Sequence, residues 1–160
     1  MEITVKTSKT NLITSTVFLF LALLITASNS YGLSFHGWVS YPAGDNPRAV
    51  AAEDFNRDGK LDFAVVSASN NIVSIWLGIG DGTFNTPVEY AVGNYPFAIA
   101  SGDFDNDGKP DLAVTNASSG TVSILLGNGD GTFASALNYS VGSDPYSIAT
   151  GDFNKDGKID

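Results

Sequence analysis

Short apolar runs separated by turn residues make up most of the chain after residue 30. In the best-defined stretch the runs are rich in Val, Ile, Ala and aromatic residues, and they predict strands at 97–102, 111–116, 122–127 and 137–141. Segments rich in Gly, Ser and Asp lie between these runs, and glycines there tolerate the positive φ of tight turns. The pattern therefore predicts an all-β fold of short antiparallel strands.

The strand pattern recurs along the chain with a period of 49 residues. Asp-rich segments begin at Asp54, Asp103 and Asp152, and residues 85–111 match residues 134–160 at 13 of 27 positions without a gap. The copies run over residues 36–84, 85–133 and 134–160, and the third is partial. Four antiparallel strands in such a period are typical of a β-propeller blade. We therefore expect about two and a half blades of an incomplete propeller.

An uncharged apolar stretch at residues 12–27 precedes the repeats, with Lys6 and Lys9 before it and small residues after it. This arrangement is typical of a secretory signal peptide, so we assign a signal peptide helix to residues 1–30 and the repeat region to residues 31–160. An uncleaved membrane anchor is the alternative, although the stretch is shorter than the roughly 20 residues that span a bilayer comfortably. We expect a secreted, extracellular or cell-surface protein that contacts a membrane only through an uncleaved leader.

Composition narrows the classes of function. The 160 residues include 17 acidic and 8 basic residues, for a net charge of −9, and no Cys. The negative charge repels phosphate backbones, so we expect no nucleic-acid partner. The lack of Cys excludes disulfides, thiolate zinc sites and cysteine nucleophiles, and no G-x-S-x-G nucleophile motif occurs. We therefore predict no catalytic residues and no enzymatic activity in this segment.

The Asp-rich segments carry the candidate chemistry, and each joins the first and second predicted strands of a copy. Oxygen-bearing side chains occupy positions one, three, five and nine, and Gly occupies position six. Alternate side chains of a curling loop converge on one point, the Gly permits the sharp turn, and the carbonyl of residue seven completes a ring of oxygens. Oxygen donors without His or Cys favour Ca²⁺ over zinc, and the many flexible oxygens favour it over Mg²⁺. A solvated Asp-rich turn is the alternative, but three copies at one spacing argue against it.

The loop pattern Asp-x-Asp/Asn-x-Asp-Gly-x-x-Asp and the Gly-Asp-Gly-Thr-Phe segments at 80–84 and 129–133 resemble the FG-GAP or VCBS-type repeat. This repeat is the calcium-binding blade of integrin α-subunit propellers and of many secreted bacterial proteins. An EF-hand is excluded, because Val65 and Val114 stand at the twelfth position where it needs an acid. The resemblance implies Ca²⁺ as cofactor, held in the first loop by Asp54, Asn56, Asp58, the Lys60 carbonyl and Asp62. The implied second set is Asp103, Asp105, Asp107, the Lys109 carbonyl and Asp111, and the third is Asp152, Asn154, Asp156, the Lys158 carbonyl and Asp160.

The resemblance also implies a binding and adhesion function. We expect a calcium-stabilised scaffold for a protein or carbohydrate ligand, present here as the N-terminal fragment of a longer protein. The alternative is the propeller part of a secreted carbohydrate-active lyase or hydrolase, and a third reading is a spacer in a surface protein. If the chain truly ends at Asp160, we expect self-association to complete the ring. Trp38, Tyr41, Trp76, Tyr90 and Tyr139 could line a sugar-binding face, but repeating aromatic residues are more often blade-packing residues.

The charge of the loops predicts an order of affinity. The middle loop contains four acids and one Lys, whereas each of the others contains three acids and two basic residues. We therefore expect the middle loop to bind Ca²⁺ most tightly. In a calcium titration, Asp107→Ala should lose more affinity than Asp58→Ala, and equal losses would contradict this order.

Overall fold

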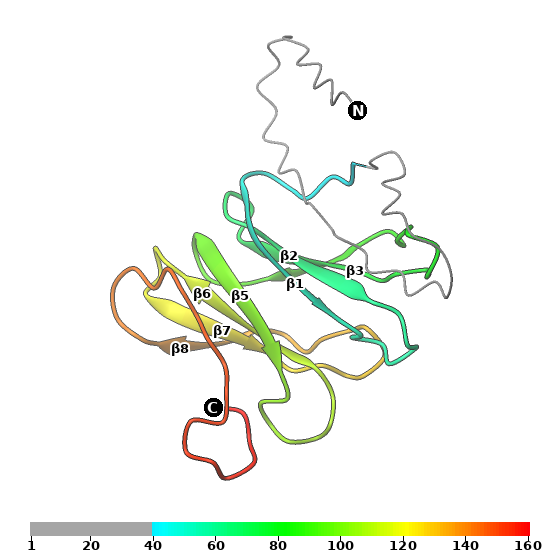
Figure 1. Ribbon diagram of the computed structural model, residues 1–160. Helices are drawn as coiled ribbons and strands as arrows, with labels where there is room; N and C mark the ends of the chain where they lie inside the picture. Colours follow the sequence, from blue (N-terminus) through cyan, green and yellow to red (C-terminus); the bar gives the residue numbers. More distant parts are fainter. Residues whose placement is uncertain (1–39) are drawn as a thin grey trace, which may run out of the picture.

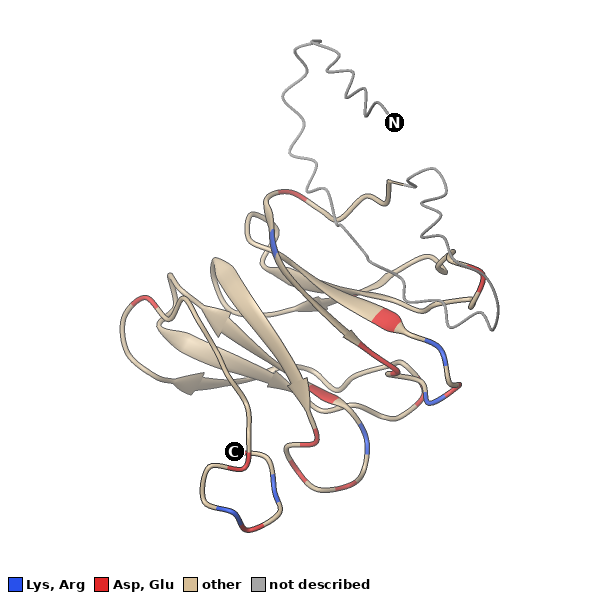
Figure 2. Ribbon diagram, in the orientation of Figure 1, with Lys and Arg blue, Asp and Glu red and all other residues tan. Residues whose placement is uncertain are grey.

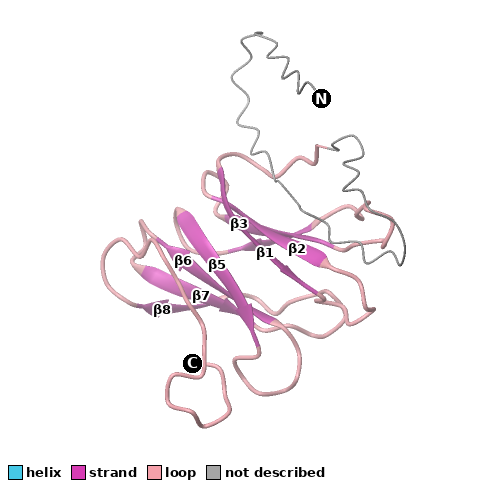
Figure 3. Cartoon of the chain, in the orientation of Figure 1, coloured by secondary structure: helices cyan, strands magenta, loops and turns pink. Residues whose placement is uncertain are grey.

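The computed structural model describes residues 40–160, which form two four-stranded antiparallel sheets and no helix (Figures 1 and 3). The first sheet contains β1 (Pro47–Glu53), β2 (Asp62–Ser67), β3 (Ile72–Trp76) and β4 (Val88–Ala91). The second contains β5 (Pro96–Gly102), β6 (Asp111–Asn116), β7 (Thr121–Leu125) and β8 (Leu137–Ser140). Within each sheet every strand pairs with the next strand along the chain. This up-and-down order is that of a propeller blade.

These sheets confirm the all-β prediction and its repeat. Each strand of the second sheet begins 49 residues after its counterpart in the first, and the predicted strands agree with β5–β8 to within two residues at each end. Residues 141–160 of the third copy contain no strand, although the Asp160 amide donates a hydrogen bond to the Gly151 carbonyl at 2.9 Å. The predicted signal peptide and Trp38 lie outside the described residues. In residues 40–160 no helix is long and apolar enough to cross a membrane.

The core lies between the two blades. β1 and β5, the first strands of the blades, lie side by side (Figure 1). β2 and β6 are buried along their whole length, and the residues after their first Asp are apolar on both faces at 63–66 and 112–114. The facing apolar side chains are Ala64, Val66, Val73 and Ile75 from the first blade and Leu112, Val114 and Leu125 from the second. Sheet stacking therefore buries side chains that no single blade could cover.

The acidic loop of the first blade takes part in this stacking. The Phe55 ring is only 1% exposed and packs edge-on against Phe133 of the second blade, with 5.5 Å between ring centroids. The Phe55 carbonyl accepts a hydrogen bond from the Gly131 amide at 3.2 Å. The Tyr90 hydroxyl in turn accepts a hydrogen bond from the Phe133 amide at 3.0 Å. A loop of one blade is thus fastened to the β7–β8 connection of the next.

Three of the candidate aromatic residues pack inside the structure. Tyr41 lies edge-on to Trp76 and to Phe84, with centroid distances of 5.5 and 5.4 Å, and Tyr90 packs on Phe133 at 5.7 Å. These contacts confirm the expectation that such residues pack in the blades. The Tyr90–Phe133 contact joins the two blades, whereas Tyr41 and Trp76 pack with Phe84 inside one repeat copy. Tyr139 is their repeat partner on the outer strand of the second blade and is 55% exposed.

Two of the three repeat-related phenylalanines at the second loop position provide a matched stability test. Phe55→Ala removes a fully buried ring between the blades and should lower the free energy of unfolding by about 3–5 kcal/mol. Phe153→Ala truncates a ring that is 73% exposed, so its effect should stay within about 0.5 kcal/mol. Denaturant unfolding of the full chain measures both, and equal losses would show that the interface is not the main source of stability.

Candidate metal centre

The acidic loops connect β1 to β2 and β5 to β6, and they lie at the same end of the two sheets (Figure 2). In the first loop the fourth residue, Arg57, has φ +60° and the sixth, Gly59, has φ +82°. The same two positions have positive φ in the second and third loops, at Asn106, Gly108, Lys155 and Gly157. A residue without a side chain adopts the sixth-position conformation readily, which confirms the expected role of this Gly.

The first and third side chains of each loop fold back over the loop backbone. The Asp54 carboxylate accepts hydrogen bonds from the Asp58 amide at 3.0 Å and from the Gly59 amide at 2.8 Å. The Asn56 side-chain oxygen accepts a second bond from the Asp58 amide at 3.0 Å. Equivalent bonds form in the other two loops, with first-position acceptors Asp103 and Asp152. All three loops therefore share one conformation, including the loop that no strand follows in the described residues.

The middle loop brings three of the predicted ligands together. Asp103, Asp105 and Asp111 each offer a carboxylate oxygen, and these oxygens lie within 4.8 Å of one another. They are the first, third and ninth positions of the loop. A set of carboxylate oxygens at this spacing is suited to a hard cation and offers no nitrogen or sulfur ligand. The donor chemistry therefore fits the cation that the sequence predicts.

The fifth-position carboxylate of the middle loop lies outside this cluster, and a lysine engages it. The Lys109 ammonium lies 2.5 Å from Asp107 Oδ2, and the Lys60 ammonium lies 3.0 Å from Asp58 Oδ2. This contact lowers the pKa of the Asp107 carboxyl, and Asp107 raises the pKa of the Lys109 ammonium. The other carboxylate oxygen accepts a hydrogen bond from the backbone amide of the same lysine, at 2.9 Å for Asp107. Sequence reasoning placed this side chain among the ligands and missed its partner.

The ninth-position carboxylates of the first two loops are buried and bind the backbone. Asp62 Oδ2 accepts from the Phe55 amide at 2.9 Å, and Oδ1 accepts from the Gly78 amide at 2.8 Å. Asp111 makes the corresponding bonds to Phe104 and Gly127, both at 2.8 Å. Burial is the largest influence on these carboxyls and raises the pKa of each, whereas the amide hydrogen bonds oppose the rise. The predicted closing ligand is thus also a structural connection between the loop and the segment after the third strand.

That connection requires a very close approach of two backbones. A Cβ on Gly78 would lie 2.3 Å from the Leu61 carbonyl oxygen, and one on Gly127 would lie 2.1 Å from the Pro110 carbonyl oxygen. No other residue fits at this distance. Sequence reasoning explained these glycines by the turn that follows them, whereas the recurrence of Gly two residues after each third strand was the signal for the contact.

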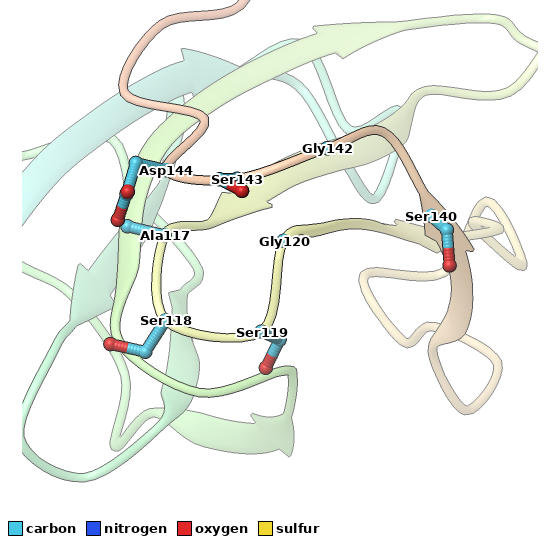
Figure 4. Close-up of a pocket in the computed structure, with 8 residues that line it drawn as sticks. All are labelled: Ala117, Ser118, Ser119, Gly120, Ser140, Gly142, Ser143 and Asp144. Carbon is cyan, nitrogen blue, oxygen red and sulfur yellow. The ribbon is translucent and has the colours of Figure 1, made fainter.

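A second candidate site lies at the opposite end of the second blade. A shallow pocket of about 430 Å³ opens between the β6–β7 turn and the segment after β8 (Figure 4). It is lined by Ala117, Ser118, Ser119, Gly120, Ser140, Gly142, Ser143 and Asp144. Since β6 starts beside the acidic loop and ends at this turn, the sheet separates the two sites. The hydroxyl groups suit hydrogen bonding to a polar ligand, but the lining contains no His, Lys or Arg.

The four-stranded blades, each entered through an acidic loop, define a β-propeller repeat protein. The family model described as FG-GAP-like repeat matches residues 54–114 and again residues 103–160, which together exceed half of the chain. The chain therefore belongs to the FG-GAP-like repeat family, and the predicted resemblance is confirmed.

Comparison with curated proteins finds no match. Among solved structures, the chain is similar to a mutant Tc holotoxin pore of Photorhabdus luminescens, with 22% sequence identity and a TM-score of 0.46. That similarity covers 69% of this chain and 5% of the toxin chain.

The buried carboxylate can be tested separately from any metal. Asp62→Asn keeps the shape of the side chain but turns a donor toward a backbone amide, so one buried N–H loses its partner. The free energy of unfolding should fall by about 1–3 kcal/mol even in the presence of a chelator. Asp58→Asn alters an exposed side chain and should have a much smaller effect under the same conditions. Denaturant unfolding in EDTA measures both variants. An unchanged free energy of unfolding for Asp62→Asn would contradict the structural role of this carboxylate.

Proposed function

We propose that this protein is a calcium-stabilised β-propeller scaffold that acts outside the cell or at its surface, where it binds a protein or carbohydrate ligand without catalysing a reaction. The observation that carries the proposal is the convergence of Asp103, Asp105 and Asp111 in a loop whose conformation is repeated in each copy. Family membership supports the propeller, and the oxygen-only donor set supports Ca²⁺ as the ion.

In the middle loop the ion would be held by Asp103, Asp105, Asp107, Asp111 and the Lys109 carbonyl. Its charge would offset the mutual repulsion of carboxylates that burial and proximity otherwise make costly. Asp111 also binds the Gly127 amide, and the first loop is fastened to the second blade through Phe55. Ion binding at these loops would therefore stabilise both the blade and its contact with the neighbouring blade.

The predicted extracellular location rests on the leader at residues 1–30. Calcium is plentiful outside the cell, so even sites of low affinity would be occupied there. For the ligand-binding surface, the hydroxyl-lined pocket at the end opposite the loops is suited to the polar groups of a carbohydrate or a peptide. This separation of a metal-braced end from a ligand-facing end is consistent with a scaffold.

Calcium should stabilise the folded chain by mass action. At a free concentration 100 times the Kd, each site contributes about 2.7 kcal/mol, so Tm should rise by at least about 5 °C over the value in EDTA. Mg²⁺ should produce a smaller rise, because it requires tighter octahedral geometry. Asp103→Asn should reduce the calcium-dependent part of the shift. Thermal unfolding of the full chain measures these shifts, and a Tm that does not respond to calcium would refute the proposed site.

The absence of catalysis is tested with a panel of polysaccharides. We expect binding of particular glycans or proteins in calcium, with no release of reducing ends and no formation of unsaturated products. Turnover by the purified chain would instead support the alternative of a carbohydrate-active lyase or hydrolase. A chain that shows neither binding nor turnover would favour the third reading, a spacer in a surface protein.

A further inference from the structure

In two of the three acidic loops a lysine ammonium pairs with the carboxylate of the predicted fifth-position ligand. We propose that Lys60 and Lys109 act as intramolecular competitors of the metal ion, because their ammonium groups keep the fifth-position carboxylates away from the ion and thereby weaken its binding. This inference rests on the proposed binding of calcium and assigns these lysine side chains a role in setting its affinity.

The contacts of the fifth-position carboxylates carry the argument. Asp58 accepts hydrogen bonds at both oxygens from a single residue, from the Lys60 amide and from the Lys60 ammonium, each at 3.0 Å. Asp107 is bound in the same way by Lys109, at 2.9 and 2.5 Å. In the middle loop the carboxylates at positions one, three and nine converge, and the one bound by lysine does not. Release of the ammonium would free Oδ2 for an ion while the backbone bond to Oδ1 remains.

The fold holds each lysine in a defined path. A Cβ on Gly80 would lie 2.8 Å from Lys60 Cδ, and one on Gly129 would lie 3.0 Å from Lys109 Cδ. The lysine stems therefore run across the glycines of the β3–β4 and β7–β8 connections, which leave room for them. This repeated route distinguishes the pairs from chance contacts of mobile surface side chains.

The third loop provides the contrast within the same chain. Lys158 occupies the equivalent position, yet it forms no ion pair with Asp156 among the described residues. Asp156 Oδ2 instead accepts a hydrogen bond from the Asn154 amide group at 3.2 Å. Lysine engages the fifth-position carboxylate in the first two loops, and a neutral amide engages it in the third.

Site-resolved titration tests the proposal. The amides of Gly59, Gly108 and Gly157 each donate to the first-position carboxylate of their own loop, so their NMR signals report calcium binding loop by loop. Calcium is titrated into the ¹⁵N-labelled full chain carrying Lys60→Gln or Lys109→Gln. Arg57→Gln is the matched control, because it removes the same charge from the first loop without removing a carboxylate partner.

We expect Lys60→Gln to lower the Kd of the first loop by about two- to fivefold relative to Arg57→Gln, a range consistent with the loss of an exposed ion pair. Lys109→Gln should do the same in the second loop, and Lys158→Gln should change the third loop no more than Arg57→Gln changes the first. Equal effects of Lys60→Gln and Arg57→Gln would overturn the inference and leave only a general charge effect. Weaker binding after either paired-lysine substitution would also overturn it. Glycine signals of the unsubstituted chain that do not respond to calcium would instead refute the proposed metal binding itself.

Discussion

The structure of each blade depends on one buried carboxylate at the start of its second strand. Asp62 and Asp111 are fully buried, and such a group is costly unless its oxygens are hydrogen-bonded. The partners are backbone amides from two different segments, the acidic loop before the strand and the glycine that follows the third strand, 16 residues later. Because both oxygens must be satisfied together, the loop, the second strand and the following connection have to assemble as one unit.

The contact between blades builds on that unit. The loop held by Asp62 presents Phe55 to the second blade, and the connection held by Asp111 ends in Phe133, which receives it. The contact removes apolar side chains from solvent. Val73 and Ile75 face the second blade and are buried, whereas their repeat partners Val122 and Ile124 are only half-buried. The apolar side chains of a propeller repeat are thus covered by its neighbours, in accordance with the behaviour of repeat proteins generally.

The loops combine strong negative charge with extensive local compensation. Backbone amides neutralise part of the first-position and ninth-position carboxylates, and a lysine side chain neutralises the fifth in two loops. Such compensation lets the loop adopt its conformation from its own hydrogen bonds, so that a cation would meet a largely preformed set of oxygens. The same compensation limits how strongly the cation would be attracted.

The sequence by itself determined the local features of this protein. The 49-residue period, the four strands, the positions of the turns and the positive φ of Gly59, Gly108 and Gly157 follow from residue patterns that act over a few neighbours. The match of carboxylates to a cation also followed, since their spacing within one loop was visible. Only the tertiary structure decided that Asp62 and Asp111 bind distant backbone amides. It also decided that Gly78 and Gly127 permit the close approach of two backbone segments, and that the Phe55 ring lies between the blades. These contacts join segments that are far apart along the chain, and the energies that select them arise from burial, which no local pattern of residues expresses.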